Sequence, residues 1–164
     1  MPRTLSISLV AALLVAGSAY AATATITNER VGRVHLGQKH AVLQARGLLG
    51  RARKGCELAG PGTRAARLRA PLTGTANLTR RTPRRVRDIT VTKGAAARGV
   101  GIGATLADIK AKFPHATVDH STDEVFLYTL VRVPRRDGGR MSFAIGTTSG
   151  KVTAIGIPFI AACE

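Results

Sequence analysis

Aromatic side chains are scarce in this chain of 164 residues, which has no Trp, two Tyr and four Phe. Residues 22–94 contain none. All aromatic residues after residue 21 lie in the second half: Phe113, Phe126, Tyr128, Phe143 and Phe159. Proteins that bind single-stranded nucleic acid without sequence preference usually stack the bases on aromatic rings. Because the first half lacks such rings, we expect no specific nucleic-acid partner.

Long hydrophobic runs are also missing. The apolar stretch from Leu5 to Ala16 is shorter than the ~20 residues of a membrane-spanning helix. It follows Arg3 and precedes an A-x-A sequence at residues 19–21, an order typical of a secretory signal peptide. We therefore expect cleavage near Ala21 and a secreted, periplasmic or cell-envelope protein. After cleavage we expect no transmembrane segment.

Acidic residues are few, with 9 Asp and Glu against 25 Lys and Arg, a net charge of +16. Residues 22–94 hold 16 basic and 3 acidic residues, a net charge of +13, whereas residues 95–164 hold 8 and 6, a net charge of +2. A cluster of arginines on one surface attracts anionic polymers. The candidates for anion binding are Arg64, Arg67, Arg69, Arg80, Arg81, Arg84, Arg85 and Arg87. Arg outnumbers Lys 19 to 6, so a solvated, arginine-rich surface is the other interpretation.

Recognisable catalytic and metal-binding motifs are absent. The chain has no G-x-S-x-G sequence, and the "HSTD" sequence from His120 to Asp123 places triad letters on consecutive side chains, which diverge. The segment "HATVDHSTDE" meets no standard metal-ligand spacing. We expect a non-enzymatic protein without catalytic residues, metal or cofactor.

Glycines are plentiful before one predicted helix, in "RGVGIGATLADIKAKF" (Arg98 to Phe113). A dinucleotide-binding loop needs G-x-G-x-x-G directly after a strand. Here the spacing is G-x-G-x-G, and the preceding "KGAAAR" does not read as a buried strand. Thr105 followed by Asp108 instead predicts a helix N-cap with a capping box. A nucleotide site is not expected.

The two halves align without gaps at an offset of 66 residues. "VHLGQKHAVLQARG" from Val34 then matches "VGIGATLADIKAKF" from Val100, and "VRDITV" from Val86 matches "VTAIGI" from Val152. We interpret this as a duplication, with units at residues 22–94 and 95–164. In the second unit "EVFLYTLVRVP", "RMSFAIG" and "KVTAIGIP" predict strands. The predicted fold class is α+β, with two tandem units of a short helical segment and a three- to four-stranded antiparallel meander.

Such units, each with a glycine before its helix, resemble the superfamily that contains the secreted β-lactamase inhibitor protein and the small outer-membrane assembly lipoproteins. The resemblance implies non-enzymatic protein binding by a sheet face. The aromatics lie in the second half, so Phe126 and Tyr128 are the expected protein contacts. Two functions remain open: a module that binds another protein through this face, or one that binds an anionic envelope polymer through the first-half arginines.

The two cysteines, Cys56 and Cys163, predict a disulfide, because an even cysteine count in an exported chain favours bridging. The bridge would join the first unit to the end of the second and contribute ~4 kcal/mol in the chain-entropy model. We expect no free thiol in the exported protein. Thiol titration of denatured, unreduced protein checks this, and two labelled thiols per chain would contradict it.

Overall fold

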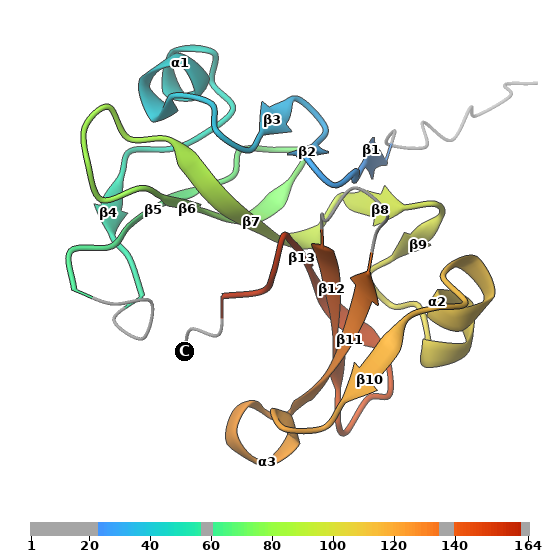
Figure 1. The fold of residues 1–164 in the computed structure, drawn as a ribbon. Coiled ribbons are helices and arrows are strands. Elements are labelled where there is room, and N and C mark those ends of the chain that lie inside the picture. The colour runs from blue at the N-terminus through green and yellow to red at the C-terminus, as the bar shows by residue number, and fades with distance from the viewer. Residues whose placement is uncertain (1–22, 57–60, 135–139, 162–164) are drawn as a thin grey trace, which may run out of the picture.

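The computed structural model describes residues 23–56, 61–134 and 140–161, and β-strands are the predominant regular structure in them (Figure 1). The strands are β1 (Ala24–Thr25), β2 (Arg30–Val31), β3 (Val34–His35), β4 (Arg53–Lys54), β5 (Arg64–Arg67), β6 (Thr73–Leu78), β7 (Val86–Lys93), β8 (Ala95–Ala97), β9 (Val100–Gly101), β10 (Thr117–Asp119), β11 (Tyr128–Pro134), β12 (Arg140–Gly146) and β13 (Val152–Ile157). The helices are α1 (His40–Ala45), α2 (Leu106–Lys112) and α3 (Asp123–Phe126). No helix in the described ranges combines the length and the apolar character needed to cross a bilayer.

Eight strands form one antiparallel sheet in the order β10-β11-β12-β13-β7-β6-β5-β4. The two halves of the chain meet in its middle, where β13 pairs with β7 through Ile155–Val91, Gly156–Thr90 and Ile157–Ile89. A smaller sheet, β1-β8-β9, also crosses the halves, because β1 pairs in parallel with β8. The remaining strands, β2 and β3, form a two-stranded sheet.

The predicted fold class of two helix-and-meander units is therefore wrong. The protein is mostly β, because its three described helices have only 6, 7 and 4 residues. The strands that were expected to close separate meanders pair with each other and produce one continuous sheet. Which strands pair depends on contacts between residues far apart in the sequence. The alternating pattern within each strand does not specify these contacts.

The hydrophobic core covers one face of the large sheet. Ile89 and Phe143 point into it from the sheet, and Leu43 of α1 and Ile109 of α2 pack over it, all four fully buried. Full burial of each such side chain stabilises the fold by ~1.5–3 kcal/mol. Figure 1 shows α1 and α2 on this side of the sheet and the chain after β13 on the other side. Neither α1 nor α2 covers the second face, and the first half of that face is left open to carry a site.

The segments before the two longer helices make matching contacts 66 residues apart. The backbone N–H of Gly37 donates to Val86 O at 2.7 Å, and that of Gly103 donates to Val152 O at 2.8 Å. Both glycines have positive φ, 76° and 88°, which favours glycine. These glycines position each helix over a strand of the large sheet.

Two local predictions need correction. The "KGAAAR" segment contains a strand, β8, in which Ala95 and Ala97 are buried, because small side chains suffice for close packing there. The predicted strand "EVFLYTLVRVP" begins as helix α3 and becomes β11 only at Tyr128. Asp123 and Glu124 occupy the first turn of α3, where the helix dipole favours acids. Leu127, in the left-handed conformation with φ 56°, ends the helix.

The predicted capping box of α2 is confirmed. The backbone N–H and the hydroxyl of Thr105 both donate to Asp108 Oδ2 at 2.8 Å, and Asp108 N–H donates to Thr105 Oγ1 at 3.3 Å. The backbone hydrogen bond, followed by the hydroxyl bond, lowers the pKa of the Asp108 carboxyl below its ordinary value.

We expect Asp108→Asn to lower stability at neutral pH by a pH-dependent amount. A carboxyl whose folded pKa is lowered contributes stability above its unfolded pKa, about 4, and loses it as the pH falls through the folded pKa. Urea denaturation midpoints over a pH series check this: the deficit of the variant should shrink below about pH 4. Glu29→Gln, at an exposed position outside the helices, is the control. A deficit independent of pH would contradict the assigned role.

Candidate functional site

The open face of the first half of the sheet carries a cavity of about 950 Å³, which we call the basic groove. Its cationic residues come from β4 with the residues around it and from β5 with its C-terminal extension: Arg51, Arg53, Lys54, Arg67 and Arg69. Its polar floor comes from β6 and β7: Thr75, Asn77, Thr90 and Thr92. Ala161, in the segment after β13, also contributes to the lining.

The alternation of side chains along β5 and its C-terminal extension explains why Arg67 and Arg69 point into the groove. Ala66 and Leu68 are buried in the core, so Arg67 and Arg69 between and beyond them point to the opposite face. Arg67 pairs with Thr75 on β6, and Thr75 pairs with Thr90 on β7. One arginine and two threonines thus form a row across three neighbouring strands.

The chain before β4 is tied to β5 by backbone hydrogen bonds. Gly50 N–H donates to Arg67 O at 2.8 Å, and Arg69 N–H donates to Leu48 O at 3.0 Å. His40, only 8% exposed, places its Nε2 3.0 Å from Gly50 O. Because a carbonyl oxygen can only accept, Nε2 of His40 donates this hydrogen bond. These bonds fix the backbone that carries Arg51 and Arg53.

The chain after β4 is anchored in the same way. Thr63, a buried residue, donates its hydroxyl to Cys56 O at 2.7 Å, and Gly55 N–H donates to Thr63 O at 2.8 Å. The two ends of the β4 wall are therefore held on the sheet, which fixes the position of its cationic side chains.

The four arginines of the groove have no partner within the described ranges. The guanidinium groups of Arg51, Arg53, Arg67 and Arg69 form no ion pair or hydrogen bond with the described residues, and none of the described lining residues is acidic. All four arginines are exposed. An unpaired group of cations in a cavity focuses a positive potential that attracts anions.

A buried carboxylate lies beside the floor but does not neutralise the groove. Asp88 is 0% exposed and accepts hydrogen bonds from Asn77 Nδ2 at 2.6 Å and from Arg87 Nε at 2.9 Å. Its charge is thus balanced by Arg87, which also lies over the ring of Phe159 at 5.9 Å.

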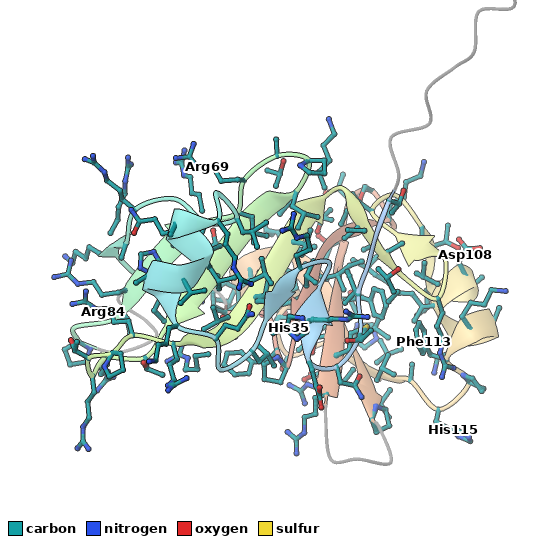
Figure 2. The ribbon with its side chains drawn as sticks, turned by 90° about the horizontal axis from the view of Figure 1, so that it is seen from above. His35, Arg69, Arg84, Asp108, Phe113 and His115 are labelled. Carbon is teal, nitrogen blue, oxygen red and sulfur yellow. The ribbon has the colours of Figure 1, made fainter. Side chains whose placement is uncertain are left out.

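The eight candidate arginines do not form one patch. Arg67 and Arg69 lie in the groove, whereas Arg64 pairs with Leu78 at the other end of β5, outside the lining. Figure 2 shows Arg69 and Arg84 at separate margins of the sheet. Arg87 forms an ion pair with Asp88.

Four of the candidates belong to the turn between β6 and β7: Arg80, Arg81, Arg84 and Arg85. This turn packs against the chain before α1, because Arg84 O accepts from His40 N–H at 2.9 Å and Arg85 Nη1 donates to Gly37 O at 2.8 Å. Arg84 and Arg85 therefore help to hold the segment before α1 in place.

Sequence reasoning missed Arg51, Arg53 and Lys54. Their signal was present, because "RARK" places three cations in four residues just before Cys56. It was not recognised because β4 is only two residues long, too short to show the alternation that identifies a strand.

The predicted protein contacts lie at the α3–β11 junction rather than in the groove. Phe126 and Tyr128 stack there, with ring centroids 5.9 Å apart. Burial raises the pKa of the Tyr128 phenol. Val125 and Leu127 beside them are 67% and 70% exposed. We call these four residues the apolar knob.

Part of the predicted disulfide lies outside the described residues. Cys56 is half-buried and lines the groove with Ala161, two residues before Cys163. The chain after β13 folds closely over the sheet, since a Cβ at Gly156 would lie 2.5 Å from Phe159 O and 2.6 Å from Ile160 Cγ1. The C-terminal segment thus approaches Cys56, but Cys163 itself is not described and the bridge stays a prediction.

No metal-ligand cluster occurs among the described residues: nowhere do three His, Cys, Asp or Glu side chains come together. In the segment considered for metal binding, His120 Nδ1 lies 2.8 Å from Asp123 Oδ2, and Arg132 pairs with Asp119 at 2.6 Å. These contacts connect α3 and the edge of the sheet.

Comparisons of the chain with protein-family models, with curated proteins and with solved structures found no match. The resemblance to the superfamily of the secreted β-lactamase inhibitor protein therefore stays a prediction. Any function has to be argued from the site itself.

Proposed function

We propose that the protein is a non-enzymatic binding module that holds an anionic polymer in the basic groove. The observation that carries this proposal is the convergence of Arg51, Arg53, Lys54, Arg67 and Arg69 on one cavity, with no acidic residue among its described lining. The predicted export of the chain would place this groove among envelope and extracellular polymers, many of which carry sulfate, phosphate or carboxylate groups.

The unpaired state of the guanidiniums supports this proposal over a merely solvated basic surface. Arginine recognises sulfate, phosphate and carboxylate by bidentate hydrogen bonds. A dispersed arginine-rich surface would not concentrate its cations in a cavity whose β4 wall is held at both ends by hydrogen bonds. The same composition spread over the molecule would give salt-dependent but site-independent binding.

The double variant Arg67→Gln/Arg69→Gln should weaken binding to heparin about thirtyfold or more, because it removes two charge-assisted contacts of ~1 kcal/mol or more each. The slope of log K against log salt should become shallower by roughly 0.7–0.9 per lost contact. Isothermal titration calorimetry across a salt series measures both quantities.

The matched control is Arg80→Gln/Arg81→Gln, which removes the same charge from the β6–β7 turn outside the groove lining. It should change affinity by no more than about twofold, since ~0.4 kcal/mol is expected from a small change in the long-range field. Equal losses in the two variants, or no heparin binding by the wild type at moderate salt, would contradict the groove as the site.

Protein binding through the second half is the second candidate, favoured by the apolar knob. Large apolar side chains exposed together with stacked aromatics are common at protein interfaces. The knob lies on α3 and the start of β11, whereas the groove lies on β4–β7. The two surfaces are thus separate and can be tested separately.

A photocrosslinking residue at position 127 should yield one discrete adduct in the native host if the knob docks a protein. The same residue at position 102, where Ile102 is 39% exposed beside α2, is the control. Adding Phe126→Ser should abolish the adduct, because it removes an aromatic ring that stacks within the knob. The absence of any adduct at position 127 would eliminate this second function.

A further inference from the structure

We infer that the polymer held by the basic groove is an anionic glycan rather than a polyphosphate or a nucleic acid. This inference rests on the proposed function and specifies its ligand class. The groove floor differs in chemistry from the groove walls. The walls carry the cations, whereas the floor presents neutral side chains from two adjacent strands.

The floor offers hydroxyl groups at regular positions. Thr75 on β6 lies directly opposite Thr90 on β7, and Thr92 follows two residues later on the same face of β7. A hydroxyl both donates and accepts a hydrogen bond. The hydroxyls of Thr75 and Thr92 make no hydrogen bond with other described residues, and both residues have accessible surface, whereas the Thr90 hydroxyl is buried. Thr75 and Thr92 are therefore free to bind a ligand that itself donates and accepts.

The neighbouring Arg67 and Thr75 place charge recognition and hydroxyl recognition side by side. Arg67 and Thr75 are paired residues on neighbouring strands. Because such strands are ~4.8 Å apart, their side chains leave the sheet next to each other. A sugar acid or a sulfated sugar carries its anionic group and its hydroxyls on one ring. Such a ring can satisfy Arg67 and Thr75 together.

The competing polymers match the floor less well. A polyphosphate chain has anionic oxygens that can accept a hydrogen bond from a threonine hydroxyl, but it has no donor for the hydroxyl oxygen, so it would use only half of the hydrogen-bonding capacity of the floor. Nucleic acid bound without sequence preference needs aromatic platforms for its bases. The described lining residues include no aromatic side chain. The glycan is the ligand class that uses the walls and the full hydrogen-bonding capacity of the floor.

The test compares Thr75→Val with wild type for a heparin hexasaccharide and for polyphosphate of equal net charge. Valine keeps the shape and removes the hydroxyl, so the lost hydrogen bond should weaken hexasaccharide binding about fivefold, which is ~1 kcal/mol. Polyphosphate affinity should fall by clearly less, because its oxygens can only accept from the hydroxyl, and both salt slopes should not change. Thr73→Val, on the same strand but outside the lining, is the matched control. Circular dichroism and denaturation midpoints of both variants check folding.

The outcomes separate the two proposals. Loss of hexasaccharide affinity confined to Thr75→Val supports the glycan. If Thr75→Val leaves hexasaccharide and polyphosphate binding unchanged while Arg67→Gln/Arg69→Gln weakens both, the groove is a simple polyanion site and the glycan inference is overturned. A single-stranded oligonucleotide that binds more tightly than the hexasaccharide at equal charge and salt would also overturn it. If no polyanion binds, the proposed function fails as well.

Discussion

The pairing of β7 with β13 is the contact on which the rest of the structure depends. It joins residues more than sixty positions apart, and it joins two four-stranded arrays into one sheet. A single sheet has only two faces. Val91, Ile155 and Ile157 bury one face together with α1 and α2, which leaves the other face free of helices. The basic groove exists because the first half of that second face is not covered by the core.

The scarcity of acidic residues determines the character of that open face. Most folded proteins pair surface arginines with nearby carboxylates, although each exposed pair contributes only ~0–1 kcal/mol. Here residues 22–94 contain three acids. Asp88 is one of them, and it is buried against Asn77 and Arg87. The groove arginines are therefore left without partners among the described residues, at a small cost in stability and with a gain in attraction for anions. The excess of basic over acidic residues is thus found in the groove itself as well as in the overall composition.

Local features were predictable from sequence, whereas the arrangement of strands was not. The capping box of Thr105 and Asp108 was identified because its signal lies within four residues. Strands β12 and β13 were predicted from the alternation of Met141, Phe143 and Ile145 and from "VTAIGI". The continuity of the sheet could not be predicted, since any two strands with apolar faces can pair in principle. For the same reason the arginine cluster was predicted as one patch, although the turn carrying Arg84 and Arg85 packs against the chain before α1.

The most direct test of the central claim is to map the bound ligand on the protein by NMR. Backbone amide signals of 15N-labelled protein would be followed while a heparin hexasaccharide is added at moderate salt. The account predicts that the largest shifts lie in residues 50–54, 65–69, 74–77 and 90–92, with little change in residues 80–85 and 123–128. Shifts centred on the β6–β7 turn or on the apolar knob, or shifts spread evenly over the basic surface, would contradict a ligand site in the groove.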